Sequence, residues 1–412
     1  MSLPHSSQNG AAGSAAETAN PNAVNSLNLM LTTMVKSGDK VSDLFLSPGN
    51  PPLIEIMGQL APVKINGLEK LTGAQTAGIS KILIGSNSQA KHDLETNGSA
   101  DLSYSVAGLS RFRVNIFMQR NTHAVVLRVV NETPPRFEDL SLPEHLKQIA
   151  DLKNGIVLVT GATGSGKSST LAAVIDLINE TKRYHIITIE DPIEFVHQHK
   201  LSAVHQRELH RDTTSFASAL RAALRQAPKV ILVGEMRDRE TVEIALEAAE
   251  TGHLVLSTLH TVNASKTVDR IIGIFPKNEE QAIRTRLATS FRYIVSQRLL
   301  PRADGRGRIA ALEILKSTSR TRDYIEKGES EGKSLTDAME AGETEGMQTF
   351  DGVLEKMIRA GAITAAQGLV YATNANNLQL RISDLANAPK PAPPEETPSE
   401  NGSLLGEIEL NG

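Results

Sequence analysis

Strict alternation of hydrophobic and polar positions marks the amino-terminal part of the chain. Over residues 111–119, Phe112 and Val114 alternate with Arg111 and Arg113, as expected for a strand with one buried face. The other elements predicted here are a helix from about 26 to 38, strands at 43–46 and 53–56, a helix at 73–85 and a strand at 123–130. Together they predict a small α+β domain over residues 26–130.

From residue 141 onward the pattern changes to short, continuous apolar runs separated by helical periodicity. A strand that is buried on both faces has such a pattern, because helices cover both sides of a parallel sheet. The predicted strands are 156–160, 185–190, 230–234, 253–258 and 309–313, and the predicted helices between them include 213–226 and 239–250. This alternation predicts an α/β domain with a mostly parallel sheet over residues 141–317.

Three kinds of segment lie outside these two predicted domains. Residues 131–140 contain Thr133-Pro134-Pro135, which is typical of a stiff, extended linker. Residues 1–25 and 386–412 are rich in small and polar residues or proline, so we expect disordered tails. Helical patterns at 278–297, 319–328, 332–340, 348–359 and 364–373 lead to a predicted carboxy-terminal helical region over 318–385.

A glycine-rich stretch follows the first predicted strand of the α/β domain. Residues 161–168, Gly-Ala-Thr-Gly-Ser-Gly-Lys-Ser, fit the phosphate-binding pattern G-x-x-x-x-G-K-[ST], and a helical pattern follows at 169–179. Glycines let backbone N–H groups approach an anion closely, and a helix N-terminus favours bound phosphate. Lys167 would reach the β- and γ-phosphates, and the Ser168 hydroxyl would ligate Mg²⁺. ATP and Mg²⁺ are therefore the expected ligands, and the predicted binding residues are Gly161, Ala162, Thr163, Gly164, Ser165, Gly166, Lys167, Ser168 and Ser169.

Two further predicted strands end in carboxylates. Glu190, Asp191 and Glu194 follow the strand at 185–190, and Glu235 follows the strand at 230–234. Either Glu194 or Glu190 could accept a proton from an attacking water, while Asp191 could organise Mg²⁺. Glu235 takes the place where a P-loop enzyme holds its metal, although the usual residue is Asp. The alternative interpretation of each cluster is a solvated acidic turn.

Histidines and arginines supply the remaining candidates. His260 ends a third strand and could sense the γ-phosphate, whereas His253, taken alone, favours a structural role. Arg111, Arg113 and Arg128 lie before the linker, and a strand face that carries arginines is most often simply solvated. In a ring, however, an arginine from a neighbouring subunit could stabilise charge on the transferring phosphoryl group.

Composition narrows the class of protein. The chain has 412 residues, a formal net charge of −4 and no cysteine. The acidic balance disfavours a broad nucleic-acid surface, and the absence of cysteine excludes disulfides and thiolate zinc sites. No apolar run approaches the roughly 20 residues of a membrane span, and no signal-peptide pattern is evident. We therefore expect a cytoplasmic protein that binds no nucleic acid.

Several motifs in the same order resemble the secretion ATPases, and within them the PilT/PilU family of type IV pilus retraction ATPases. The matching stretches are the P-loop at 161–168, the acidic box at 189–195, residues 206–213, Gly-Glu-Met-Arg-Asp at 234–238, the histidine box at 251–261 and residues 346–350. The resemblance covers about 27–385. It implies an amino-terminal PAS-like domain, a RecA-like ATPase domain and a homohexameric ring with ATP bound between the two domains.

The resemblance also implies roles for single residues. Glu194 would be the catalytic glutamate, Glu235 the atypical Walker B acid, and His253 and His260 the histidine-box residues, which adds His253 to the expected nucleotide-binding set. The implied function is a hexameric, ATP-hydrolysing motor that powers pilus retraction and twitching motility. It would act at the cytoplasmic face of the inner membrane through a platform protein, and reach the membrane only through partners.

Some residues depart from the family pattern and leave alternatives open. Ala162 stands where the family usually has proline, and residues 320–327 keep only part of a carboxy-terminal motif. Residues 372–381 look more like the PilU branch, so the chain could be an accessory motor that depends on a second retraction ATPase. A non-hydrolysing, ATP-gated scaffold is another alternative, against which the intact acids argue. Extension ATPases usually carry paired Cys-x-x-Cys motifs, which this chain without cysteine lacks. A nucleic-acid motor would need a basic channel, and the acidic charge balance disfavours this class.

Overall fold

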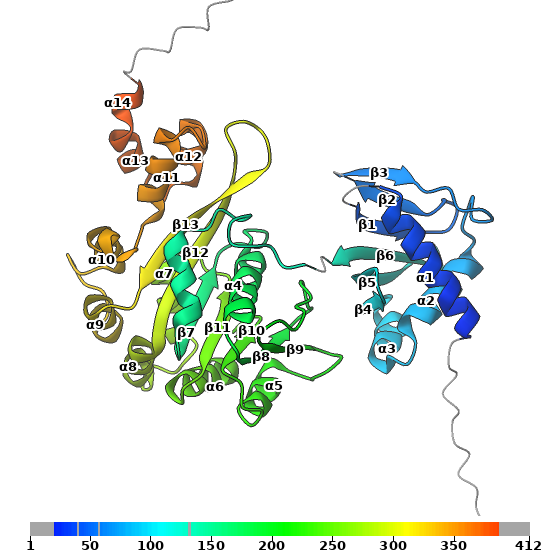
Figure 1. The fold of residues 1–412 in the computed structure, drawn as a ribbon, viewed down its shortest axis with the longest axis horizontal. Coiled ribbons are helices and arrows are strands. Elements are labelled where there is room, and N and C mark those ends of the chain that lie inside the picture. The colour runs from blue at the N-terminus through cyan, green and yellow to red at the C-terminus, as the bar shows by residue number, and fades with distance from the viewer. Residues whose placement is uncertain (1–19, 39–40, 57, 131–132, 387–412) are drawn as a thin grey trace, which may run out of the picture.

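The computed structural model describes residues 20–38, 41–56, 58–130 and 133–386. It contains two β-sheets, each with its own helices, followed by a group of helices near the carboxyl end (Figure 1). Most of both predicted tails, residues 1–19 and 387–412, lies outside the described residues, as do residues 131 and 132 of the predicted linker. Every helix among the described residues is too short or too polar to serve as a membrane span.

The amino-terminal sheet has six strands in the order β3-β2-β1-β6-β5-β4, and all neighbours are antiparallel. Its elements are α1 (Pro21–Lys36), β1 (Val41–Leu46), β2 (Leu53–Ile56), β3 (Gln59–Pro62), α2 (Gly73–Ile84), α3 (Ser88–Asn97), β4 (Ser99–Val106), β5 (Ser110–Gln119) and β6 (Thr122–Val130). As the alternation predicted, Phe112, Val114 and Ile116 enter a core that includes Leu31 and Leu44. The three helices therefore cover one sheet face.

The first helix begins earlier than the sequence pattern predicted. Proline at the first helical position, Pro21, is favourable because its missing N–H would have no intrahelical partner there. The Asn20 side chain accepts a hydrogen bond from Asn22 N and caps this end. Residues 21–25 therefore belong to a helix, and the prediction that they form part of a disordered tail is wrong.

The second sheet has seven strands in the order β13-β12-β7-β11-β10-β8-β9, and only β12 and β13 pair antiparallel. Its elements are η1 (Glu144–Asp151), β7 (Gly155–Thr160), α4 (Lys167–Thr181), β8 (His185–Glu190), β9 (Ala203–Glu208), α5 (Phe216–Ala223), β10 (Val230–Val233), α6 (Arg239–Glu250), β11 (Leu254–Leu259), α7 (Ala264–Ile272), α8 (Glu280–Ser290), β12 (Phe291–Pro301) and β13 (Arg308–Lys316). The predicted α/β class with a mostly parallel sheet is confirmed.

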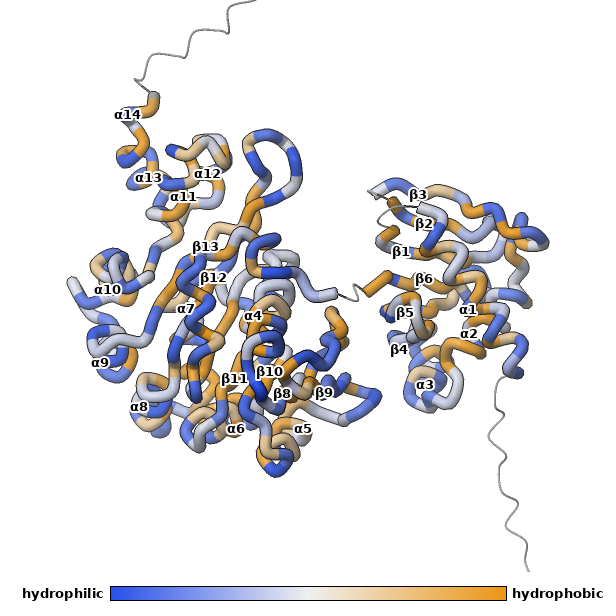
Figure 2. The backbone as a smooth tube through the Cα atoms, viewed as in Figure 1, coloured by the Kyte–Doolittle hydropathy of each residue, from blue (hydrophilic) through white to orange (hydrophobic). Residues whose placement is uncertain are grey.

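A separate hydrophobic core lies on each face of this sheet. Ile156 and Leu158 of β7 pack into the core that contains residues of α5, α6, α7 and α8, whereas Val157 and Val159 pack into the core that contains residues of η1 and α4. Successive strand residues point to opposite faces, so a continuous apolar run is what a strand covered on both sides requires. Figure 2 shows hydrophobic residues along the strands of both sheets.

The predicted helix over 278–297 is only partly correct. Helix α8 ends at Ser290, and β12 begins at Phe291 and pairs with β7 on one side and β13 on the other. Residues of β12 alternate between the two cores: Ile294 packs in one and Val295 in the other. The periodicity of a short apolar run does not distinguish a strand from a buried helix. The conformation of residues 291–301 is decided by their position between β7 and β13.

The carboxy-terminal helices are α9 (Ser319–Lys327), α10 (Leu335–Ala341), η2 (Glu343–Glu345), α11 (Phe350–Arg359), α12 (Ala365–Tyr371), α13 (Ala375–Arg381) and α14 (Ser383–Ala386). Four of them lie where helical periodicity predicted helices. Phe350, Leu354 and Leu378 form a small core with Leu300 of β12. Helices α11 and α13 are thus anchored on the β12–β13 hairpin, whereas Ile325 of α9 and Leu335 of α10 pack into the core that contains α8.

Candidate nucleotide-binding site

The glycine-rich loop 161–166 joins the carboxyl end of β7 to the first turn of α4, as the motif requires. Gly166 has a φ of 89°, and a Cβ on it would lie 2.8 Å from Gln297 Nε2; a Cβ on Gly161 would collide with the Gln297 carbonyl oxygen. Both positions therefore exclude other residues. Gly166 caps α4 without any side-chain hydrogen bond, so the first N–H groups of the helix stay available to an anion.

Lys167 is folded back over this loop. Its Nζ donates hydrogen bonds to the carbonyl oxygens of Gly161, at 2.9 Å, and Ala162, at 3.0 Å. Burial lowers the pKa of Lys167, while the negative charges of Glu194 and Glu235 act in the opposite direction. Phosphate oxygens could replace the two carbonyls and would restore favourable electrostatics for the buried ammonium group.

Ser165 supplies a second sign that the loop is built for a ligand. Its side-chain oxygen is buried and has no hydrogen-bond partner among the described residues. A buried hydroxyl without a partner costs free energy, which an incoming hydrogen-bonding group would relieve. The positive charge of Lys167, the free N–H groups and the unpaired Ser165 hydroxyl therefore make the loop suitable for a bound polyphosphate.

Gln297 of β12 fixes the loop from behind, and the sequence analysis missed it. Its Oε1 accepts a hydrogen bond of 2.8 Å from Thr170 Oγ1 on α4, and the neighbouring Ser296 hydroxyl accepts one of 3.0 Å from Thr160. These contacts join the two ends of the loop to β12. No local signal could have revealed them, because residues up to 297 showed helical periodicity.

A cavity of about 760 Å³ opens beside the P-loop. Residues predicted for the site that line it are Arg113, Thr163, Gly164, Gly166, Lys167, Ser168, Ser169, Glu190, Asp191, Glu194, Glu235 and His260. They come from the carboxyl ends of β7, β8, β10 and β11, and Arg113 comes from β5 of the amino-terminal sheet. The carboxyl edges of parallel strands gather at one side of the sheet, which is why motifs far apart in sequence meet here.

Glu235 lies beside two basic groups at this edge. Its Oε2 is 2.7 Å from Arg237 Nε and 3.5 Å from His260 Nε2, and the carboxylate is largely buried. The ends of β10 and β11 therefore form one polar cluster. A change at the phosphate end of the cavity can therefore reach His260 through Glu235.

The oxygens in the cavity fit a magnesium ion that is held mainly by phosphate and water. The described residues contain no group of three or more His, Asp or Glu side chains arranged to hold a metal by themselves. Mg²⁺ keeps several waters and typically takes one or two protein oxygens together with substrate phosphates. The Ser168 hydroxyl and the carboxylates of Glu235 and Asp191 line the cavity and supply oxygens of this kind.

Glu190 at the end of β8 and Glu194 in the loop that follows differ in their surroundings. Glu190 accepts hydrogen bonds from Thr188 Oγ1, at 2.6 Å, and Gln206 Nε2, at 3.1 Å, and burial raises its pKa. Glu194 is half exposed, and its nearest charged partner is Arg113 Nη1 at 4.0 Å. Glu194 is thus free to meet a water molecule, whereas Glu190 is engaged by its neighbours.

The three arginines do not act together. Arg113 lines the cavity, but Arg111 forms an ion pair with Glu208 at the edge of the seven-stranded sheet. Arg128 lies opposite Arg113 in the antiparallel register, and its Nε is 2.8 Å from Oδ1 of the buried Asp43. Arg111 and Arg128 therefore do not reach the cavity of their own chain.

His253 is also outside the cavity, contrary to the role that the family resemblance implied. It precedes β11, whereas His260 follows that strand, so about 20 Å of extended chain separates them. His253 Nδ1 lies 2.9 Å from the Ala248 carbonyl oxygen, which satisfies it locally. The structural role that the residue suggested on its own agrees with this position.

The far end of the cavity is formed by residues that no motif indicated. Asp139 and Leu140 are the last residues of the predicted linker and Ser141 follows it, and Arg302, Arg308 and Ile309 belong to the β12–β13 hairpin. This end combines apolar surface with two positive charges. The hairpin and the linker are brought together only by the fold, so sequence spacing carried no signal for them.

The strand, P-loop and helix on a parallel sheet, with carboxylates at the same sheet edge, define a P-loop nucleotide-binding protein of the RecA-like class. The family model "Type II/IV secretion system protein" matches residues 96–364. The chain belongs to this family of secretion ATPases, and within it to the PilT/PilU group.

Relatives cover most of the chain. It is 44% identical to the type IV pilus retractation ATPase PilT of Pseudomonas aeruginosa over 81% of this chain and 94% of that protein. It is 42% identical to the type IV pilus ATPase PilU of the same organism over 86% of this chain and 90% of that one. The crystal structure of the pilus retraction motor PilT with bound ADP aligns with a TM-score of 0.77 at 41% identity, covering 86% of this chain and 99% of that chain.

Proposed function

We propose that this protein is a homohexameric motor that hydrolyses ATP to power type IV pilus retraction and twitching motility. It would act on an inner-membrane platform protein from the cytoplasmic face. The observation that carries the proposal is the convergence of Lys167, Glu194 and Glu235 with Arg113 of the other sheet on one cavity. Similarity to PilT over 94% of that protein supports the choice of pilus retraction.

Binding would begin at the P-loop. The Lys167 ammonium would exchange its two loop carbonyls for β- and γ-phosphate oxygens, and the N–H groups of the first turn of α4 would bind the same phosphates. The Ser168 hydroxyl and Glu235, with Asp191 beside them, would hold Mg²⁺ or its waters. When bound, Mg²⁺ neutralises charge that develops on the phosphate oxygens.

Hydrolysis would use the half-exposed Glu194. Its carboxylate would orient a water toward the γ-phosphorus and accept a proton as the new P–O bond forms and the bond to ADP breaks. Arg113 would stabilise negative charge on the transferring group, and His260 would respond to phosphate loss through Glu235. The products are ADP and inorganic phosphate.

Movement would follow because the site draws on two sheets. Arg113 belongs to the amino-terminal sheet and the P-loop to the other, so nucleotide binding and release would change how the two sheets dock. We place the rotation in the predicted linker 131–140, in which Phe137 already packs into the core beside η1 and α4. In a ring, subunits that change conformation in turn would move the platform protein.

Replacement of Glu194 by Gln tests the assignment of the catalytic carboxylate. We expect kcat for ATP to fall about 10²–10⁴-fold, because the amide cannot accept the proton. Binding of a fluorescent ATP analogue should be retained, since Glu194 does not hold the phosphates. Equal turnover of the variant and the wild type would refute the assignment, and a wild type without ATPase activity would refute the motor.

Similarity to PilU favours a second candidate, an accessory motor that works with another retraction ATPase. The identity to PilU extends over 353 residues, slightly more of this chain than the match to PilT. Deleting the gene and scoring surface pili and twitching decides between the two. A motor that retracts alone should restore twitching in a strain that lacks every other retraction ATPase, and an accessory motor should fail there.

A further inference from the structure

A buried glutamate joins the two halves of the molecule. Glu208 ends β9 at the edge of the seven-stranded sheet and pairs in register with Glu190. Its Oε1 accepts a 2.7 Å hydrogen bond from Ser103 Oγ of β4, and its Oε2 accepts one from Arg111 Nη2 of β5. Both donors belong to the amino-terminal sheet, so this carboxylate is bound from outside its own domain.

The same carboxylate also holds the loop that carries Glu194. Glu208 Oε2 accepts a hydrogen bond of 3.1 Å from the backbone N–H of Ile193, the residue directly before Glu194. Arg113, two positions after Arg111 on the same strand, lies 4.0 Å from Glu194. One contact between the sheets therefore sets both the backbone next to Glu194 and the arginine that faces it.

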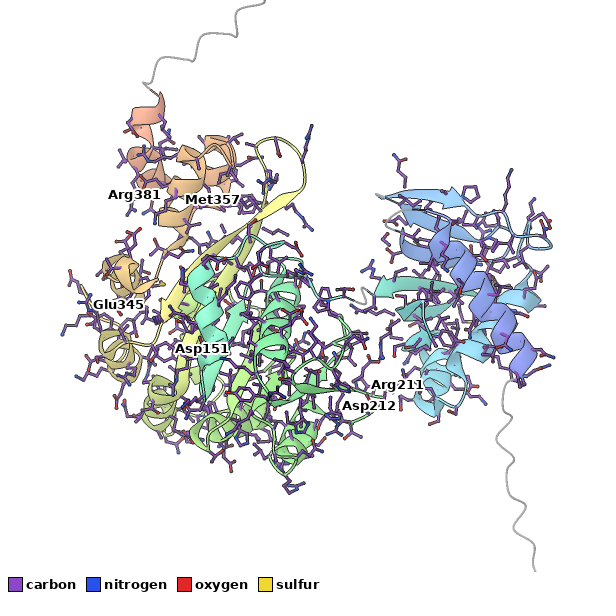
Figure 3. All side chains as sticks on the ribbon, in the orientation of Figure 1. Asp151, Arg211, Asp212, Glu345, Met357 and Arg381 are labelled. Carbon is purple, nitrogen blue, oxygen red and sulfur yellow. The ribbon has the colours of Figure 1, made fainter. Side chains whose placement is uncertain are left out.

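The turn after β9 braces Glu208 in this position. Glu208 N donates a 2.8 Å hydrogen bond to Asp212 Oδ2, and Arg211 Nη1 donates one of 3.1 Å to Ser103 Oγ. Figure 3 shows Arg211 and Asp212 on the side of the larger domain that faces the amino-terminal sheet. The carboxylate is thus fixed by its own turn and completed by the other sheet.

The energetics make this contact sensitive to docking. When the amino-terminal sheet leaves, water replaces the directed hydrogen bonds from Ser103 and Arg111, so the carboxylate of Glu208 is hydrated and is no longer held in one orientation. If the amino-terminal sheet moves away, Glu208 loses Ser103 and Arg111 together and keeps only the N–H of Ile193. The loop before Glu194 is then attached through the Ile193 N–H to a carboxylate that is free to change its orientation.

We propose that Glu208 is a positioning residue that couples docking of the amino-terminal sheet to the placement of Glu194. Hydrolysis is then fast only when Ser103 and Arg111 hold Glu208, which ties turnover to the arrangement of the two sheets. The proposal rests on the proposed function, because it assigns Glu208 to the ATPase step in which Glu194 acts.

Steady-state kinetics of the full-length protein test the coupling. In Glu208→Gln, kcat for ATP should fall at least about tenfold while KM changes less than about twofold, because no phosphate-binding group is touched. Arg111→Gln should give a similar loss, and the double variant should be no slower than about threefold below the slower single variant. Glu250→Gln is the matched control, since Glu250 forms a bidentate pair with Arg286 between α6 and α8.

The absence of cysteine allows a direct measure of docking. Cysteines introduced at the exposed Lys91 on α3 and Arg225 after α5 can carry a dye pair, with labelled subunits diluted into unlabelled ones. Glu208→Gln should shift the energy transfer between the dyes, and Glu250→Gln should leave it unchanged.

The possible outcomes separate this inference from the proposed function. Reduced kcat with unchanged KM, a non-additive double variant and shifted energy transfer support the coupling. An active wild type whose Glu208→Gln variant turns over at an equal rate, or in which the two losses multiply, overturns the coupling and leaves the motor intact. A wild type without ATPase activity overturns the proposed function and the coupling with it.

Discussion

The two sheets of this molecule use their surfaces differently. The seven-stranded sheet is covered on both faces, so its chemistry is confined to the loops at one edge, where Lys167, Glu194 and Glu235 meet. The six-stranded sheet is covered on one face, and its other face presents Arg111 and Arg113. Functional side chains at a sheet edge are brought together because parallel strands end on the same side. Side chains on an open sheet face become functional only through the surface that docks against that face.

The charged groups of the two sheets reflect this difference. In the larger sheet, burial raises the pKa of Glu190, and it raises the pKa of Glu313 to about 7, which favours their neutral forms. In the smaller sheet, the arginines find carboxylates: Arg128 contacts Asp43, and Arg111 contacts Glu208 of the other domain. Burial thus shifts the pKa of these two glutamates of the larger sheet, whereas the two arginines of the smaller sheet are held by ion pairs.

The largest expected effect is at the edge of the parallel sheet. Lys167→Ala should lower kcat at least about 10²–10³-fold, because it removes the charge that stabilises the phosphates in the transition state. ATPase assays with purified protein measure this. Lys229→Ala, an exposed lysine before β10 at the opposite edge, should keep full activity. A comparable loss in both variants would show that the effect comes from the fold and not from the site.

Glu313 should make stability depend on pH. An acid whose pKa is raised by folding stabilises the protein at low pH, and this contribution is lost as pH rises through about 4.5 to 7. The raised pKa corresponds to about 3 kcal/mol of unfolding free energy. Urea unfolding measures the free energy of unfolding at about pH 5 and about pH 8. This free energy should decrease less from the lower to the higher pH in Glu313→Gln than in the wild type. Equal decreases would contradict the burial effect.

Substitutions of the arginines on the open sheet face should affect kcat differently according to the position of each arginine. Arg113→Gln should reduce kcat by about tenfold or more, because Arg113 lines the cavity and faces Glu194. Arg128→Gln should reduce it less than about threefold, since its partner is Asp43 within the same sheet. Equal losses would show that neighbouring subunits bring Arg128 to the nucleotide, as an arginine from another chain can do.

The smallest effect is expected at the histidines of β11. His260→Asn should lower kcat several-fold, because His260 contacts Glu235 in the cavity. His253→Asn should leave KM for ATP within about twofold of the wild-type value, since His253 lies at the far edge of the sheet and is bonded to Ala248. Stopped-flow binding of a fluorescent ATP analogue provides a second measure. A large increase in KM for His253→Asn would restore it to the binding site.

The sequence by itself determined the nucleotide site. The P-loop places Lys167 and Ser168 at a helix N-terminus through local geometry alone. The acids and His260 follow predicted strands, and parallel strands bring their carboxyl ends to one edge whatever the details of packing. Helical periodicity and strand alternation likewise located most elements, because these patterns report which face of each segment is buried.

Only the tertiary structure decided the rest. The change from α8 to β12 at Phe291, and with it the placement of Gln297 behind the P-loop, depends on the pairing of β12 with β7 and β13. The pair between Arg111 and Glu208 joins residues 97 positions apart on different sheets. Local periodicity indicates which residues are buried but not which part of the molecule covers them. The sequence around Arg111 or Glu208 therefore does not predict that the two domains dock there.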